Sequence, residues 1–537
     1  MNKLAVVLCL ALTAIAPRVR AAGQRCEQLV QLALPDTTVT SAEVVPAGAF
    51  TPPQGATPWL IGDPAFYKQL PAFCRVKAEA KPSPDSEIKI EVWMPVSGWN
   101  GKFRGQGNGG FAGEMDYRAL GLAILQGYAS AATDTGHAAG GTDATWALNH
   151  PEKIIDFAYR GIHQMTTVGK ETLKAFYGDS PKHAYFANCS NGGRQALMEA
   201  QRYPGDYDGI LAGAPANYWT HLLAGALGNA QATTADPASY IPSSKIPAIA
   251  QSVLAACDAK DGVTDGILND PRQCHFDPQT MICKGADTDS CLTPPQVAAL
   301  KKLYEGAYDS SGRQIFPGFA PGGEQGNGGW SLWITGSAPG KSLLFAFEYG
   351  YFGDMVYDRP DWDYKTTNLD EAAAASDKKF SRVLNATETD LKAFQERGGK
   401  LILYHGWSDA AISPLNSINY YESVVHKMGQ RDADAFMRLY MVPGMQHCAG
   451  GPGTDVFGEN GMSTADDPEH NMYIALERWV ETGAPPSSII ASKTEGQGPA
   501  AKVRMTRQLC AYPEIAKYKG SGDTNDASNF LCNAPKR

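Results

Sequence analysis

Two cysteines flank two reactive side chains that lie far apart in this chain, and they limit how it can fold. Ser190 follows Cys189 in the segment Asn-Cys-Ser-Asn-Gly-Gly, and His447 directly precedes Cys448. If the chain is exported to an oxidising compartment, the two sulfurs can bond. Such a bond would fasten a serine turn to a histidine loop. The fold must then bring together two segments separated by nearly half of the chain.

The start of the chain supports export. Residues 1–21 are predicted to be a signal peptide, with a positive charge at Lys3, an apolar run over 4–16 and a small residue at Ala21. We therefore expect a secreted or periplasmic protein. Of the eleven cysteines, Cys9 leaves with this segment. The even number that remains favours disulfides, and the competing use, a zinc site, would need paired Cys-x-x-Cys sets that the sequence lacks.

Charge and hydropathy exclude several classes of function. The 537 residues carry a net charge of −9, so there is no basic footprint and no nucleic-acid partner is expected. After the N-terminal run, no stretch reaches the roughly 20 apolar residues of a membrane span, so we expect no membrane partner. A chain of this length favours two domains over one simple core. The oligomeric state stays open.

Strand and helix signals alternate in the first part of the mature chain, then fade, then return. This alternation predicts the α/β class, with a parallel sheet covered by helices. Strands are predicted at residues 88–93, 102–105, 128–133, 183–188, 208–214, 400–404 and 436–442, and helices at 152–177, 193–203 and 469–482. The simplest account is a core interrupted by an insertion. The expected parts are a first core part (22–219), a lid domain (220–390) and a second core part (391–537).

Ser190 stands in the sequence context of a nucleophile elbow. A buried strand is predicted before it and a helix after it, and Gly192 and Gly193 supply the small neighbours that a sharp turn needs. The N-terminus of that helix would help to stabilise developing negative charge. The usual Gly-x-Ser-x-Gly pattern is altered, because Asn188 stands at the first glycine. An ordinary Ser N-cap is the alternative interpretation.

Two loops after the resumed strands hold the candidate acid and base. Asp409 and His447 each follow a predicted strand, where active-site groups of open α/β sheets collect. The order Ser190, Asp409, His447 is that of α/β-hydrolases. In this arrangement the histidine takes the serine proton and the aspartate orients the imidazole. His405 and His137 are rival histidines; we expect His405 to hydrogen-bond at the end of its strand and His137 to have a structural or pocket-wall role.

Acyl transfer also needs two donors aimed at the tetrahedral oxygen. One would be the amide N–H of Asn191, the residue after the candidate nucleophile. The other would come from the loop after an early strand, where Gly109 and Gly110 fit. The sequence leaves open which of the two glycines donates. A plain glycine turn is the alternative for this segment.

Taken together, these motifs closely resemble the tannase and feruloyl esterase family, which also contains a bacterial enzyme that cleaves mono(2-hydroxyethyl) terephthalate. The resemblance spans essentially the whole mature chain and implies a serine carboxylic ester hydrolase of α/β-hydrolase fold with a large inserted lid. It is carried by three motifs: Cys189-Ser190 before two glycines, His405-Gly406-x-x-Asp409, and Gly444-Met445-x-His447-Cys448.

The family pattern and the local spacing also suggest how the cysteines pair. The bridge between the serine and histidine loops requires two Cα atoms within about 7 Å, which contact between Ser190 and His447 would allow. In the chain-entropy model, a loop of that length is worth about 4 kcal/mol or more. The expected pairs are Cys26–Cys74, Cys189–Cys448, Cys257–Cys274, Cys283–Cys291 and Cys510–Cys532.

An acidic loop in the expected lid is a candidate metal site. Three aspartates fall within the segment 258–265, with a glycine after the second and the third. Hard oxygen ligands at this density suit Ca²⁺, although the spacing is not that of an EF-hand and a solvated acidic turn is the alternative. The resemblance implies a structural Ca²⁺ here. Its implied ligands are the side chains of Asp258, Asp261 and Asp265 and the carbonyl groups of Val263 and Ile267.

The resemblance places an aromatic acid on the acyl side of the ester. We expect hydroxycinnamoyl (feruloyl) esters, with gallate esters or a terephthalate half-ester as alternatives. The partner would be a small aromatic ester or an esterified plant-polymer fragment. Aromatic residues over 330–352 suit either ring stacking or a packed lid core, and we favour the core for most of them. A hypothesis of another class is an inactive polymer-binding module on a hydrolase scaffold.

Overall fold

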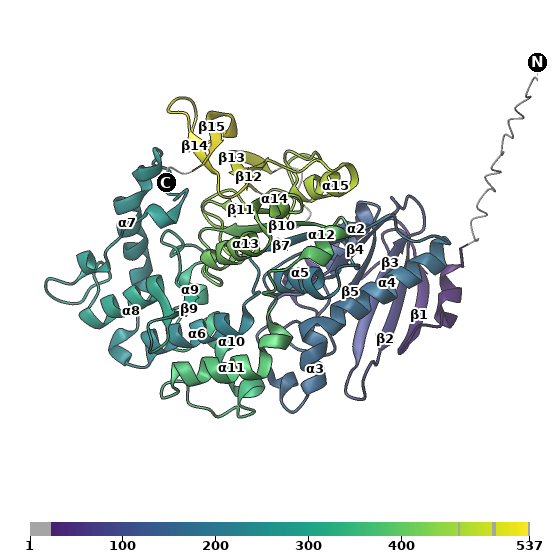
Figure 1. Cartoon of the computed structure of the whole chain (residues 1–537), viewed down its shortest axis with the longest axis horizontal. Coiled ribbons are helices and arrows are strands. Elements are labelled where there is room, and N and C mark those ends of the chain that lie inside the picture. Colours follow the sequence, from purple (N-terminus) through teal and green to yellow (C-terminus); the bar gives the residue numbers. More distant parts are fainter. Residues whose placement is uncertain (1–22, 460–461, 497–500, 535–537) are drawn as a thin grey trace, which may run out of the picture.

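The computed structural model describes residues 23–459, 462–496 and 501–534, and the predicted signal peptide lies outside the described residues. A nine-stranded sheet runs through the centre of the molecule in the order β1-β2-β3-β5-β4-β6-β7-β10-β11 (Figure 1). Helices cover both faces, and a group of helices gathers beyond one end of the sheet. The predicted α/β class is confirmed.

The sheet is antiparallel over its first strands and parallel over the rest. Pairing is antiparallel from β1 to β5 and parallel from β5 through β4, β6, β7, β10 and β11. The seven strands predicted from sequence all lie in this sheet. The strands are β1 (Thr37–Val45), β2 (Phe73–Ala80), β3 (Ile88–Pro95), β4 (Lys102–Gln106), β5 (Ala129–Thr133), β6 (His183–Cys189), β7 (Gly209–Gly213), β10 (Lys400–Gly406) and β11 (Met437–Val442).

Two strands of this sheet, β1 and β2, were not predicted from the sequence. β1 is an edge strand, and most of its side chains are at least partly exposed, so its sequence shows little alternation of apolar and polar residues. β2 alternates more clearly. A disulfide from Cys26, at the start of the short helix η1 (Cys26–Gln31), to Cys74 on β2 fastens the chain start to this edge.

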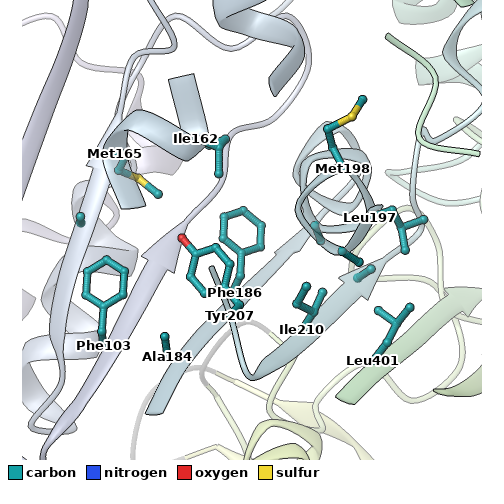
Figure 2. Packing of buried hydrophobic residues seen from close by; sticks show 14 of the residues in the cluster. Phe103, Ile162, Met165, Ala184, Phe186, Leu197, Met198, Tyr207, Ile210 and Leu401 are labelled. Carbon is teal, nitrogen blue, oxygen red and sulfur yellow. The ribbon is translucent and has the colours of Figure 1, made fainter. Parts of the chain in front are cut away.

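The helices that cover the parallel strands bury apolar side chains against them. Figure 2 shows Phe103, Phe186, Ile210 and Leu401, from β4, β6, β7 and β10, beneath residues such as Ile162 of α4 and Leu197 of α5; all belong to one buried cluster. The core helices are α1 (Pro58–Ile61), α2 (Tyr117–Leu125), α3 (Pro151–Ile155), α4 (Gly161–Tyr177), α5 (Asn191–Arg202), α12 (Lys392–Glu396), α13 (Pro414–Met428), α14 (Gln430–Asp434) and α15 (Met472–Thr482). A π-helical turn, η4 (Asp156–Arg160), joins α3 to α4.

The chain between β7 and β10 forms a largely helical unit, seen beside the sheet in Figure 1. Its central helix α6 buries most of its residues, so the amphipathic pattern that would identify a surface helix is weak. α6 begins at Trp219, and the lid boundary at residue 220 stays a prediction. The elements are α6 (Trp219–Thr234), α7 (Ile246–Cys257), α8 (Pro294–Glu305), β8 (Gly306–Tyr308), β9 (Gln314–Pro317), α9 (Trp330–Trp333), α10 (Leu343–Gly350), a π-helical turn η10 (Tyr351–Val356) and α11 (Leu369–Leu384).

The C-terminal part adds two small hairpins. β12 (Ser488–Glu495) pairs with β13 (Lys502–Cys510), and β14 (Ile515–Tyr518) pairs with β15 (Phe530–Asn533). A disulfide between Cys510 and Cys532 joins the two hairpins. No helix in the described part of the chain combines the length and the apolar character that crossing a membrane would require.

One buried cation ties the core to the lid. The Arg194 guanidinium on α5 donates to the carbonyl oxygens of Ala158 (2.8 Å), Phe157 (3.1 Å) and Leu384 (3.4 Å), and to the Asn191 side-chain oxygen (2.8 Å). Burial lowers the pKa of Arg194 to about 9. Four acceptors and the Phe157 ring, 4.8 Å away, replace the water that the guanidinium loses.

Replacing Arg194 should therefore weaken the whole fold. Arg194→Met keeps most of the stem volume but leaves three carbonyl groups without their donor, so we expect the free energy of unfolding to fall by about 3 kcal/mol or more. Urea denaturation followed by circular dichroism measures it. The exposed Arg478 of α15 offers a control, and Arg478→Met should change stability by less than about 0.5 kcal/mol. Equal urea midpoints for the two variants would contradict this account of the buried arginine.

Candidate active site

Three side chains that are far apart in sequence meet in one hydrogen-bonded chain. Ser190 lies between β6 and α5, and its hydroxyl is 2.9 Å from His447 Nε2. The Nδ1 of the same imidazole is 2.7 Å from Asp409 Oδ2. Ser190 is half-buried, and the side chains of His447 and Asp409 are largely or fully buried. With Nδ1–H donated to the carboxylate, Nε2 is left to accept the serine proton.

The serine sits on a strained turn that its neighbours enforce. Ser190 has a φ of 66°, in the left-handed region that residues other than glycine rarely adopt. A Cβ at Gly193 would lie 2.3 Å from the carbonyl oxygen of Gly213, and one at Gly192 would lie 2.1 Å from the Asn188 side-chain oxygen. The two glycines are therefore required for the helix to start this close to β7 and to the end of β6.

Asn188, which replaces the usual glycine of the elbow, has a defined place. Its side-chain oxygen accepts the N–H of Cys189 at 2.8 Å and lies directly against Gly192. The side chain thus fills the space beneath the turn and caps a backbone donor there. The altered motif is compatible with the elbow because Gly192 leaves room for the asparagine.

Asp409 is held rigidly as an acceptor. Its Oδ1 accepts the backbone N–H groups of Ala411 (2.8 Å) and Ile412 (2.9 Å), and its Oδ2 accepts from His447 and, at 3.1 Å, from His405 Nε2. Burial opposes ionisation, but the attraction of His447 and the hydrogen bonds from both imidazoles outweigh it and hold the pKa of Asp409 below its ordinary value. The group therefore stays a carboxylate that orients the His447 ring.

The rival histidines do not contact the serine. The buried His405 shares the Asp409 carboxylate, and its Nδ1 lies 2.7 Å from the Ser417 hydroxyl, so it positions the acid. His137 stacks on Trp146 with ring centroids 3.7 Å apart and donates from Nε2 to the carbonyl of Phe111 at 2.8 Å. Burial lowers the pKa of His137 to about 4, so this imidazole is neutral.

A disulfide clamps the serine turn to the histidine loop. Cys189 and Cys448 are bonded, with Cα atoms 5.9 Å apart and a sequence separation of 259. The bond joins the residue before Ser190 to the residue after His447. All five predicted pairs are confirmed, the others being Cys26–Cys74, Cys257–Cys274, Cys283–Cys291 and Cys510–Cys532.

The candidate oxyanion donors come from two neighbouring strand ends. Asn191 opens α5, and the segment with Gly109 and Gly110 follows β4, which pairs in parallel with β6. Within the described residues, the N–H groups of these three residues donate no hydrogen bond.

Two residues that sequence reasoning missed, Asn108 and Gln195, hold the loop that contains Gly109 and Gly110 against α5. The backbone N–H of Asn108 donates to the Gln195 side-chain oxygen at 2.9 Å, and the Gln195 side-chain amide donates to the Asn108 side-chain oxygen at 3.1 Å. Both side chains are buried. No local motif identifies such a pair, because its members are separated by 87 positions.

Lid aromatics border the site. The Trp333 ring meets the His447 imidazole edge-on with centroids 5.1 Å apart. Phe347 lies 6.4 Å from Trp333 and 5.2 Å from Phe111 of the core. Trp330, Tyr351 and Phe352 are buried, whereas Trp333, Phe347 and Tyr349 are partly exposed and pack against a buried cluster. The lid aromatics therefore serve mainly as packed core, whereas the Trp333 ring lies against the His447 imidazole.

The acidic loop of the lid is folded on itself. Asp258 receives the N–H of Gly266, Asp261 those of Val263 and Asn269, and Asp265 that of Ile267. Arg507 of β13 also donates to Asp265, at 2.7 Å. The three aspartates do not form a set whose ligand oxygens all lie within 4.8 Å of one another. The donor chemistry fits Ca²⁺, and in this conformation backbone N–H groups hold the carboxylates.

Comparison with known proteins identifies the family. The model of the family described as tannase and feruloyl esterase matches residues 74–533. The chain belongs to this family. An uncharacterized esterase of Xanthomonas campestris pv. campestris is 42% identical, over 95% of this chain and 91% of that protein. A probable feruloyl esterase B of Aspergillus clavatus is 34% identical, with 93% of each chain covered.

Solved structures agree with this assignment. A feruloyl esterase B from Aspergillus oryzae superposes with a TM-score of 0.86 at 29% identity, over 95% of this chain and 99% of that one. A tannin acyl hydrolase from Aspergillus niger has the same fold, with a TM-score of 0.72 at 23% identity over 94% and 92% of the two chains. The predicted α/β-hydrolase fold is confirmed, and the chain is an esterase of this family.

The Cys189–Cys448 disulfide should affect catalytic activity as well as stability. In a Cys189→Ala, Cys448→Ala double variant we expect kcat/KM for an aryl ester to fall by about 10-fold or more, because the serine turn and histidine loop lose their link. The free energy of unfolding should fall by up to about 4 kcal/mol. Initial rates and urea denaturation measure the two effects.

The lid bridge Cys283–Cys291 is the matched control, because it closes a short loop away from the triad. Its double alanine variant should keep full kcat/KM. If both double variants show the same activity as the unchanged protein, the bridge beside Ser190 has no positional role.

Proposed function

We propose that this esterase is a serine carboxylic ester hydrolase that cleaves esters of aromatic acids through an acyl-enzyme, with feruloyl (hydroxycinnamoyl) esters as its substrates. The observation that carries the proposal is the continuous chain Ser190–His447–Asp409, at 2.9 Å and 2.7 Å. This order and geometry perform nucleophilic acyl transfer in α/β-hydrolases.

In the proposed reaction, His447 Nε2 accepts the Ser190 proton as the serine oxygen attacks the ester carbonyl. The N–H of Asn191 and one of Gly109 or Gly110 bind the oxygen of the tetrahedral intermediate. His447 then protonates the departing alcohol, which leaves an acyl-enzyme on Ser190. Water, deprotonated by the same imidazole, attacks the acyl carbonyl, and the imidazolium returns the proton to the Ser190 oxygen as its bond to the acyl carbon breaks and the acid is released. Asp409 stays ionised throughout and stabilises the imidazolium.

The aromatic acyl group is supported by the relatives and by the site wall. Several relatives are named probable feruloyl esterases, among them the one from Aspergillus clavatus. Trp333 and Phe347 of the lid and Phe111 of the core form an aromatic row beside the base, which suits a planar acid. Gallate esters and a terephthalate half-ester are the alternative substrates, because their acids are planar as well.

A secreted or periplasmic location is part of the proposal. Five disulfides are typical of proteins that fold in an oxidising compartment. An external esterase would meet small aromatic esters or fragments of esterified plant polymers.

Ser190→Ala tests the nucleophile. We expect kcat/KM for methyl ferulate to fall by about 10⁴-fold or more, while the circular dichroism spectrum and thermal midpoint stay close to those of the unchanged protein. A panel of methyl ferulate, methyl gallate and the terephthalate half-ester ranks the acyl groups by kcat/KM. We expect ferulate to rank first.

A fluorophosphonate probe distinguishes the enzyme from an inactive polymer-binding module. Ser190 in the unchanged protein should be labelled, and the alanine variant should not. Undiminished turnover in Ser190→Ala would refute the assignment, and absence of labelling together with absence of turnover would favour the binding module.

We further propose that the acidic loop holds a structural Ca²⁺. The side chains of Asp258, Asp261 and Asp265 and the carbonyls of Val263 and Ile267 would supply its oxygen ligands. Gly262 and Gly266 have positive φ values of 91° and 77°, which let the loop curl around such an ion. The ion would neutralise the clustered carboxylates and stabilise the lid, and it takes no part in the acyl transfer.

Calcium removal should lower the thermal midpoint. After chelation by EDTA and dialysis, we expect a decrease of a few degrees that added Ca²⁺ reverses and added Mg²⁺ does not. Differential scanning calorimetry measures it. In Asp261→Asn the response to Ca²⁺ should be weakened or lost. A thermal midpoint that is the same with EDTA and with Ca²⁺ would show that the loop is an acidic turn without a bound ion.

A further inference from the structure

A second cluster of potential metal ligands lies at the far end of the nucleophile helix. It joins His163 on α4, Glu199 on α5 and Asp206 in the turn before β7. Glu199 lies nine positions after Ser190 along the same helix, which corresponds to roughly 13 Å. The cluster is therefore separate from the triad and from the acidic loop of the lid.

The three side chains converge on one point. One ligand atom from each lies within 4.8 Å of the ligand atoms of the other two. His163 Nδ1 is 2.7 Å from Asp206 Oδ2, and the His163 ring is held by stacking on Tyr203 with centroids 3.8 Å apart. About a third of the His163 side chain is exposed, so the cluster is open to solvent on that side.

Glu199 makes this cluster unusual. It is 1% exposed, and neither of its carboxylate oxygens has a hydrogen-bond partner among the described residues. A carboxylate buried without donors is costly unless a proton or a cation neutralises it. Burial, and then the charge of Asp206, raise the pKa of Glu199 well above its ordinary value. The position therefore requires a neutralising partner.

One cation is already nearby but is used elsewhere. The Lys170 ammonium on α4 donates to the backbone carbonyl of Asp206 and makes no hydrogen bond to Glu199. Burial lowers the pKa of Lys170. The lysine thus offsets part of the negative charge of the cluster while the Glu199 oxygens stay without a donor.

We propose that His163, Glu199 and Asp206 bind one first-row divalent cation, with Zn²⁺ as the preferred ion. One imidazole nitrogen with two carboxylate oxygens is a donor set that Zn²⁺ accepts, whereas Ca²⁺ prefers oxygen alone. The ion would replace the hydrogen bond between His163 and Asp206 and draw the Glu199 carboxylate to it. Water would complete the coordination on the exposed side.

Such an ion would join three elements of the core. α4, α5 and the turn before β7 would share one ligand set, so the end of α5 opposite Ser190 would be fixed to its neighbours. Because no ligand touches the triad, the ion would act on stability and leave the acyl-transfer chemistry unchanged.

Binding of Co²⁺, a spectroscopic substitute for Zn²⁺, tests the proposal on the full chain, purified without a histidine tag. With Ca²⁺ present to fill the lid loop, we expect one equivalent of Co²⁺ to give visible absorption bands that one equivalent of Zn²⁺ abolishes. Zn²⁺ should also raise the thermal midpoint by about 2 °C or more. Glu199→Gln keeps the shape of the side chain and should lose both effects. Asp261→Asn, in the lid loop, should retain them.

The outcomes separate the possibilities. If Glu199→Gln does not fold, His163→Gln at the exposed side of the cluster serves as the second variant and should also lose Co²⁺ binding. Absence of Co²⁺ bands in the unchanged protein, or equal bands in the unchanged protein and both cluster variants, would overturn the proposal. If the unchanged protein shows no Co²⁺ bands, a bound proton would be what neutralises the Glu199 carboxylate. Failure of Ser190→Ala to lose activity would be a separate result, because the cation test does not use turnover.

Discussion

The geometry of the candidate active site depends on the close approach of two loops, and a disulfide joins them between Cys189 and Cys448, which are 259 positions apart in the chain. The sulfurs sit directly beside the serine and the imidazole. Any movement of the histidine loop away from the elbow must therefore stretch a bonded link. This constraint helps to hold the Ser190 hydroxyl 2.9 Å from His447 Nε2, because neither loop can move away from the other without straining the disulfide.

The helix α5 connects the candidate site to several other parts of the molecule. Ser190, the candidate nucleophile, is its N-cap residue, and Asn191 is its first residue. One turn later, Arg194 reaches the π-helical turn and the end of α11, and Gln195 holds the glycine loop after β4. Near its other end, Glu199 lies in the cluster with His163 and Asp206. Each face of one short helix thus contacts a different part of the fold.

Two further contacts define the candidate site: the donors around the Asp409 carboxylate and the lid residue Trp333 beside His447. Four donors surround the Asp409 carboxylate, and His405 is among them, so this second histidine contacts Asp409, and no hydrogen bond joins it to Ser190 among the described residues. On the open side, Trp333 brings the lid to within 5.1 Å of the His447 ring. The insertion between β7 and β10 therefore contacts His447 through an aromatic ring, and it shares a buried cluster with the core, in which Phe352 packs with Phe111 and Phe157.

The class of fold, the order Ser190, Asp409, His447 and, through the family resemblance, the five cysteine pairs could be predicted from the sequence. These follow from local signals: buried strands with an apolar run, a serine followed by two glycines, and motifs that resemble one family. The edge strand β1 escaped prediction because its exposed side chains carry little pattern. Four features became visible only in the folded molecule: the pairing of Asn108 with Gln195, the carbonyl partners of Arg194, the contact of Trp333 with His447, and the lack of a hydrogen-bond partner for Glu199 among the described residues. Those contacts join residues far apart in the chain, and whether a buried polar group finds a partner depends on packing that no local pattern encodes.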